Sequence, residues 1–125
     1  MKQVYLDHAA TTPLDSQVLK AMQPYLTEKY GNPSSFHTAG KVVADDLDQA
    51  RADVAKVVGC RADEIVFTSG GTESDNLALL GYARKKQDKG KHIITTKIEH
   101  HAVLHAAQQL EKEGFEVTYL EVDSD

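Results

Sequence analysis

The feature that most constrains the fold is an alternation of β-rich runs with helical segments in the second half of the chain. Residues 64–68 form a short β-rich run that leads into a glycine turn and then into helix-forming sequence. The same order returns as a strand over 92–96, a helix over 102–112 and a strand over 115–122. Strands that alternate with helices of this length predict an α/β fold with parallel strands and right-handed crossovers.

The predicted sheet is incomplete. Three strands are few for a parallel sheet that must be covered on both faces, so the sequence predicts only the first part of a larger domain. No repeat, low-complexity tract or linker interrupts residues 1–125, and we expect no internal domain boundary. Gly114 follows the helix over 102–112 as its C-cap.

The first half of the chain is predicted to be helical after an N-terminal arm. Apolar residues recur at helical spacing over 15–30, where Pro24 must either kink the helix or start a second one. Residues 30–35 are dense in turn formers and predict a loop. From Lys41 an amphipathic pattern predicts a helix that Gly59 ends.

Composition excludes several classes of protein. The formal net charge of -5 and the lack of a long basic run argue against a nucleic-acid partner. An acidic residue, Asp7, comes before any apolar segment can form, so we expect neither a signal peptide nor a membrane span and a cytoplasmic location. Cys60 is the only cysteine, which excludes an internal disulfide. It follows Gly59 at a helix end, where the helix dipole disfavours a reactive thiolate, so we expect a structural role for its side chain.

The sharpest local signal is the glycine turn within Thr68-Ser69-Gly70-Gly71-Thr72-Glu73. Two glycines between a strand and a helix let the backbone approach a ligand, and unpaired N–H groups with about half a positive charge suit a phosphate. The backbone N–H groups of Gly71 and Thr72 are the predicted hydrogen-bond donors to this phosphate, and the hydroxyls of Ser69 and Thr72 could add further donors. The alternative is a plain tight turn with Thr72 as N-cap and Asp75 as its capping-box partner. Walker A and G-x-G-x-x-G patterns are absent.

A second signal is Glu99-His100-His101, which follows the strand over 92–96 and so falls at the carboxyl end of the sheet. His101 and His105 are spaced to share a helix face, yet further metal ligands are missing and we predict no metal site. An imidazole here can instead lie flat against an aromatic cofactor ring. The alternative is a surface histidine near a helix start.

Four motifs, in this order, resemble those of the cysteine desulfurases. They are Leu6-Asp7-His8-Ala9-Ala10-Thr11-Thr12-Pro13, Gly31-Asn32-Pro33-Ser34-Ser35-Phe36-His37, Phe67-Thr68-Ser69-Gly70-Gly71-Thr72-Glu73-Ser74-Asp75-Asn76 and Glu99-His100-His101-Ala102-Val103. The resemblance runs from about residue 4 to residue 122. It is strongest to the desulfurases that serve iron-sulfur cluster assembly and tRNA thiolation.

The resemblance implies the N-terminal part of the large domain of a fold-type I transferase that depends on pyridoxal 5'-phosphate (PLP). Such an enzyme is a homodimer that removes sulfur from L-cysteine, leaves L-alanine and passes the sulfur on as a persulfide. Position by position, Gly71 and Thr72 match the residues that hold the PLP phosphate, and His100 matches the histidine stacked on the pyridine ring. His8 and the loop at 32–33 match segments that border the active site and receive no chemical step.

The resemblance implies no catalytic residue in this chain, because the Schiff-base lysine and the persulfide cysteine belong to later segments of the family. PLP chemistry needs that lysine, so the chain alone is expected to be inactive. A cluster scaffold or a tRNA thiolase is the expected sulfur acceptor. The alternatives are a selenocysteine lyase or another class V aminotransferase-like PLP enzyme and, from a different class, a non-catalytic module that binds a phosphate ligand or pairs with a desulfurase subunit.

Overall fold

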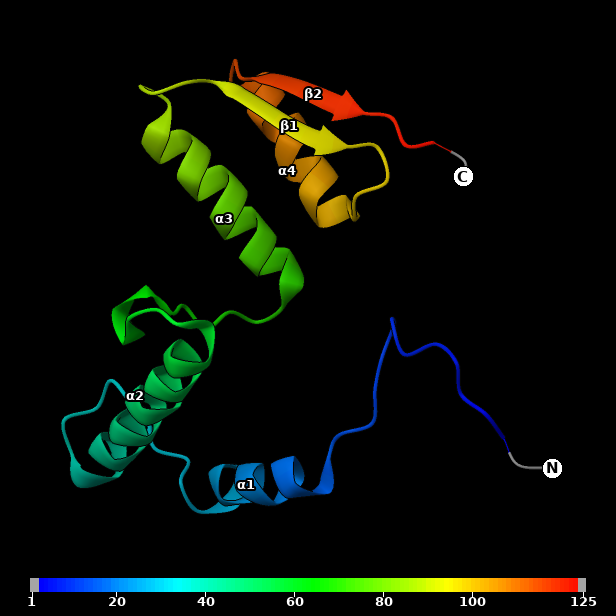
Figure 1. Ribbon diagram of the computed structural model, residues 1–125. Coiled ribbons are helices and arrows are strands. Elements are labelled where there is room, and N and C mark those ends of the chain that lie inside the picture. The colour runs from blue at the N-terminus through cyan, green and yellow to red at the C-terminus, as the bar shows by residue number, and fades with distance from the viewer. Residues whose placement is uncertain (1–2, 124–125) are drawn as a thin grey trace. The chain divides into compact units, whose positions relative to one another are not determined.

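The computed structural model describes residues 3–123, which fall into two compact units that divide between Ile65 and Val66. Figure 1 shows the helices and strands of each unit. The expectation that residues 1–125 belong to one domain without an internal boundary stays a prediction.

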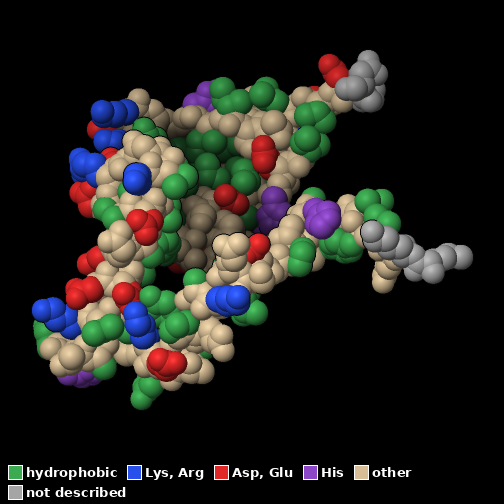
Figure 2. Space-filling model, turned by 60° about the horizontal axis from the view of Figure 1, so that its bottom comes forward, with side chains coloured by type: hydrophobic (Ala, Val, Ile, Leu, Met, Phe, Trp, Pro, Cys, Tyr) green, Lys and Arg blue, Asp and Glu red, His purple; other side chains and the backbone are tan. Residues whose placement is uncertain are grey.

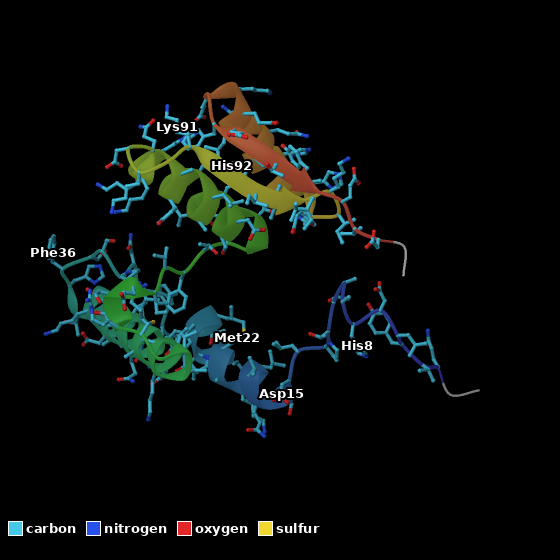
Figure 3. The ribbon with its side chains drawn as sticks, turned by 45° about the horizontal axis from the view of Figure 1, so that its top comes forward. His8, Asp15, Met22, Phe36, Lys91 and His92 are labelled. Atoms are coloured by element: carbon cyan, nitrogen blue, oxygen red, sulfur yellow. The ribbon has the colours of Figure 1, made fainter. Side chains whose placement is uncertain are left out.

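The N-terminal unit begins with an arm and then helix α1, Ser16–Thr27. Asp15 caps this helix, because its Oδ1 atom accepts the backbone N–H of Gln17 at 2.7 Å. Pro24 lies inside the last turns of α1, so the prediction that it could start a second helix is wrong. Figure 3 labels Asp15 at the start of this helix and Met22 within it.

Helix α2, Thr38–Val58, follows the predicted loop. It begins three residues before Lys41, because the Nδ1 atom of His37 accepts the backbone N–H of Gly40 at 3.2 Å and caps the helix. Gly59 ends α2 in the left-handed region, at a φ of 75°, as the sequence predicted.

The predicted strand over 64–68 does not form. Residues 62–64 instead make a short 3-10 helix, η1 (Ala62–Glu64), which is closed by the Glu64 carboxylate on the backbone N–H of Arg61 at 2.8 Å. The next carbonyl, that of Ile65, accepts the Arg51 guanidinium at 2.6 Å. A strand needs a partner for its backbone groups, and none of the described residues pairs with this segment.

The C-terminal unit contains helix α3 (Gly71–Lys86), strand β1 (His92–Thr96), helix α4 (His101–Lys112) and strand β2 (Glu116–Leu120). The strands pair in parallel, with His92 opposite Glu116 and Thr96 opposite Leu120. The predicted α/β fold with parallel strands is confirmed, although the sheet of the described residues has two strands rather than three. The second strand is shorter at both ends than the predicted 115–122.

The core of the C-terminal unit lies around α4, which packs against β2 and α3 (Figure 1). Leu110 is fully buried and Phe115 nearly so. Two backbone hydrogen bonds close the end of α4. The N–H of Phe115 donates to the carbonyl of Leu110, and the N–H of Gly114 donates to the carbonyl of Glu111, both at 3.0 Å. With Gly114 at a φ of 86°, this is a Schellman motif, and the predicted glycine stop is confirmed.

Many large apolar side chains are exposed, and Figure 2 shows hydrophobic side chains open at the surface. Within residues 3–123, no helix is both long enough and apolar enough to cross a lipid bilayer.

Candidate functional site

The glycine turn leads directly into α3. Gly70 is the N-cap and Gly71 the first helical residue, so the alternative in which Thr72 caps the helix is wrong. The N–H groups of Gly71 and Thr72 therefore belong to the first turn, where no carbonyl of the helix can accept them. Together with the positive end of the helix dipole, they form an arrangement that attracts an anion.

The C-terminal unit leaves the space beside this turn open. A Cβ atom placed on Gly70 or on Gly71 would meet no other atom within 4 Å. The hydroxyl of Thr72 makes no hydrogen bond to another described residue, and both Gly71 and Thr72 are exposed. An open turn with free amide and hydroxyl donors fits a phosphate group.

Three hydroxyls beside the turn already form hydrogen bonds. Ser69 donates its hydroxyl to Oε2 of Glu73 at 2.7 Å and its backbone N–H to the same atom at 2.6 Å. These bonds, that of the hydroxyl first, lower the pKa of Glu73. Thr68 and Ser74 share a hydrogen bond of 2.6 Å between their hydroxyls. Ser69 therefore braces the turn, and its hydroxyl is bonded to Glu73 in this structure. Its predicted part as a phosphate donor stays a prediction.

His100 is the N-cap of α4. Its Nδ1 atom accepts the backbone N–H of Ala102 at 3.1 Å, so the neutral ring carries its proton on Nε2. The residue is exposed, which leaves the ring accessible to a ligand. The stacking role that the resemblance implies for His100 stays a prediction.

Asn76 connects the two parts of the candidate site. Its Nδ2 group donates to the carbonyl of Thr72 at 2.8 Å and to the carbonyl of Ala102 at 3.4 Å. The structure thus links the glycine turn and the cap of α4 through one side chain. The local motifs did not single out Asn76, although an asparagine four residues after Thr72 falls on the same helix face and is an unfavourable helix residue.

The two helices run in the same direction. Asn76 meets Ala102 near their N-termini, and the Arg84 guanidinium binds the Glu113 carboxylate near their C-termini, at 2.6 and 2.9 Å. Both positive dipole ends therefore lie at one edge of the unit, together with the end of β1 (Figure 1). Ligands of open α/β sheets bind at this carboxyl edge.

A hollow of the C-terminal unit lies elsewhere, near the other end of α3. It has a volume of about 460 Å³ and is lined by the second half of α3, the start of β1 and Phe115. His92, which Figure 3 labels together with Lys91 at the entry to β1, also lines it. Because Gly71 and Thr72 lie at the opposite end of α3, we assign this hollow no part in phosphate binding.

Two further groups of predicted residues have no assigned role. The rings of His101 and His105 lie 5.4 Å apart, and the described residues contain no group of three or more metal-binding side chains. His8 (Figure 3) and the loop at 32–33 lie in the N-terminal unit. Their place at an active-site border stays a prediction.

The chain is similar to known proteins over nearly its whole length. The family model of class-V aminotransferases matches residues 4–125. The cysteine desulfurase IscS of Dictyoglomus turgidum is 57% identical over 122 residues, and that of Methanosarcina thermophila is 56% identical. Each match covers 98% of this chain and 31% or 30% of the relative, so the chain spans about a third of the length of the curated relatives it matches.

Solved structures show the same likeness. A NifS-like protein has a TM-score of 0.89 and 45% identity, and the match covers 98% of this chain and 34% of that one. The structure of SspA in complex with cysteine has a TM-score of 0.83 and 42% identity, with coverage of 93% and 33%. The resemblance to the cysteine desulfurases, as an N-terminal portion, is confirmed. The chain belongs to the class-V aminotransferase family.

Proposed function

We propose that this chain is the cofactor-anchoring N-terminal portion of a PLP-dependent cysteine desulfurase. One observation carries the proposal: a free glycine turn at the start of α3 lies beside the cap of α4, in a chain more than half identical to proteins named cysteine desulfurase. The complete protein would remove sulfur from L-cysteine, giving L-alanine and a persulfide on an enzyme thiol. A neighbour whose structure holds cysteine supports this choice of substrate.

The first turn of α3 would hold the cofactor's phosphate. The N–H groups of Gly71 and Thr72 point out of the helix start, and the Thr72 hydroxyl adds a third donor. The open space beside Gly71 leaves room for phosphate oxygens to approach the backbone. Glu73 turns its carboxylate toward Ser69, which satisfies that negative charge within the turn.

His100 would orient the cofactor ring. Its Nδ1 atom is fixed by the Ala102 N–H, so the plane of the imidazole is set by the start of α4 rather than by free rotation. A ring held in this way can offer a flat face to a pyridine ring. PLP, when bound, supplies the electron sink on which amino-acid chemistry depends.

The same proposal extends to the location, oligomeric state and sulfur acceptor of the complete protein. The complete protein would be a cytoplasmic homodimer that hands sulfur to an acceptor such as a cluster scaffold or a tRNA thiolase. The lysine and the cysteine that the reaction needs would come from other parts of the polypeptide, and the 125 residues alone would not release sulfur.

The test is PLP binding by the complete polypeptide and two variants. Thr72→Ala removes a donor to a charged group, which typically contributes about 1.5–3 kcal/mol, so the Kd for PLP should rise roughly tenfold to a hundredfold. Gly71→Val should weaken binding at least as much, because its side chain fills the space that phosphate needs. The Kd is measured by titration of the apo protein and read from the visible absorbance of bound PLP.

Gly90→Val is the matched control, since a Cβ atom there also meets nothing within 4 Å. It should leave the Kd unchanged. Retention of PLP by both Thr72→Ala and Gly71→Val at the wild-type Kd would remove the phosphate site from this turn.

A further inference from the structure

Asn76 is a half-buried residue in the second turn of α3 whose amide reaches two helices. Its Nδ2 group donates to the Thr72 carbonyl within α3, at 2.8 Å, and to the Ala102 carbonyl of α4, at 3.4 Å. Ala102 lies 26 residues further along the chain. Among the described side chains of α3, only Asn76 and Arg84 form a recorded hydrogen bond to α4 or its C-cap.

The chemistry of the contact favours a primary amide. The NH2 group of asparagine carries two hydrogens, so it can serve two carbonyls at once. An aspartate of the same shape would place oxygen atoms against both carbonyls, and an alanine would leave a gap. Asparagine is a poor helix former, and its cost in the middle of a helix calls for a compensating contact.

The amide lies on a short path between the two parts of the candidate site. Thr72 contributes the carbonyl on one side, and its own N–H belongs to the predicted phosphate turn. Ala102 contributes the carbonyl on the other side, and its own N–H is held by Nδ1 of His100. Ala102 and Ala106, one turn apart on α4, are both buried.

We propose that Asn76 is a positioning residue that sets the distance between the phosphate turn and the ring of His100. The proposal rests on the proposed function, because it assigns to Asn76 the alignment of two groups that hold one cofactor. The bond to Ala102, at 3.4 Å, is longer than a typical N–H···O hydrogen bond, so its loss should loosen the alignment rather than unfold the protein.

Two variants separate the two bonds of the amide. Asn76→Ala removes both of them. Asn76→Ser keeps a hydroxyl that can bond the Thr72 carbonyl within the helix, but its short side chain cannot reach Ala102. If the link between the helices is what matters, both variants should behave alike.

The first readout is the complete polypeptide with PLP. Loss of the bond to Ala102, which both variants share, should raise the Kd for PLP about threefold to tenfold in each. At saturation, the induced circular dichroism of the cofactor band should change, because the angle between ring and phosphate is no longer fixed. Gln108→Ala is the control: it also removes a primary amide from a helix, here at an exposed side chain of α4 with no recorded hydrogen bond, and should match wild type.

The second readout needs no cofactor. In the apo protein with carbon-13-labelled histidine, both variants should shift the ring resonances of His100 while those of His92 stay in place. Wild-type values of the Kd, the dichroism and the His100 resonances in Asn76→Ser, or in both variants, would overturn the proposal. A wild-type protein that fails to bind PLP would instead remove the proposed function, and the resonances would still report whether Asn76 positions His100.

Discussion

The two units of this chain differ in how much their helices bury. Helix α2 has 21 residues and buries only Gly40 and Ala55, whereas α4 has 12 residues and buries four. Of the six buried hydrophobic residues in the described chain, five belong to the C-terminal unit and one, Ala55, to the N-terminal unit. The longer helix is thus the less buried one.

The difference lies in the partners of each helix rather than in its amphipathic pattern. Helix α4 contacts strand β2 and helix α3, while α2 makes its main contacts with the short η1. Most of the stability of a helix in a protein comes from packing its apolar face. We therefore expect the C-terminal unit to have a larger free energy of unfolding than the N-terminal unit. The candidate site lies on the C-terminal unit.

The largest effect is expected from a substitution in the core of the C-terminal unit. Leu110 is 0% exposed, and Leu110→Ala should lower the free energy of unfolding by about 2–5 kcal/mol, since it removes buried methyl groups and leaves a cavity. Hydrogen exchange of the peptides over 92–96 and 101–112, followed as urea is added, measures this loss.

Leu26→Ala makes the same chemical change in α1, where the side chain is 69% exposed. It should change the stability of its own unit by no more than about 0.5 kcal/mol. Equal effects of the two leucine variants would show that the two units do not differ in the way their burial indicates.

The next largest effect is expected from alanine substitutions of two glycines that end helices with a similar positive φ angle. Gly59 ends α2 at a φ of 75° and Gly114 ends α4 at 86°. A Cβ atom added to either glycine would meet no other atom within 4 Å, so alanine there meets only backbone strain. Each substitution should cost roughly 1 kcal/mol. Gly114→Ala should speed hydrogen exchange throughout α4 and β2, because the turn at Gly114 also lets the backbone N–H of Phe115 bond the carbonyl of Leu110.

Gly59→Ala should affect only the last turn of α2, where little else is packed. Hydrogen exchange of the two helices measures both variants in one experiment. Exchange that spreads through the whole of α2 would show that the N-terminal unit unfolds as cooperatively as the C-terminal one.

The helices were predictable from the sequence, and so was the order of the second half. Apolar spacing placed α4 within one residue, and Gly59 and Gly114 marked helix ends because their positive φ angles suit glycine. The strand over 64–68 was not predictable in the same way. Its β-rich composition is real, but a strand exists only with a partner, and partners come from elsewhere in the chain.

The candidate site was predictable in its parts and not in its connections. The turn at Gly71 and Thr72 and the histidine at position 100 stand out as local motifs. Asn76 is the last residue of the third motif but does not stand out within it, because its contact with Ala102 joins residues 26 positions apart that only folding brings together. The position of the helix start, one residue before Thr72, also depends on the brace between Ser69 and Glu73 rather than on Thr72 itself.

The smallest expected effect concerns the ion pair that joins the far ends of α3 and α4. The Arg84 guanidinium, and then the Gln109 amide, lower the pKa of Glu113 from 4.5 to about 2. Because this pKa is lowered by folding, the pair stabilises the folded unit fully above pH 4.5 and loses its contribution as the pH falls toward 2. Glu113→Gln should therefore lower the melting temperature at about pH 6, by less than the core variants do, since exposed ion pairs contribute little.

The difference between wild type and Glu113→Gln should shrink as the pH falls from 4.5 to about 2, as followed by circular dichroism during heating. Asp63→Asn is the matched control in the N-terminal unit. Its partner Arg61 also lowers the pKa of Asp63, yet the two residues are only two positions apart and both are exposed. Such a pair can form in the unfolded chain as well, so its loss should leave the pH dependence of melting nearly unchanged. A pH-dependent effect in Asp63→Asn as large as that in Glu113→Gln would mean that joining two helices adds nothing to an ion pair, and the contrast between the units would then rest on apolar burial alone.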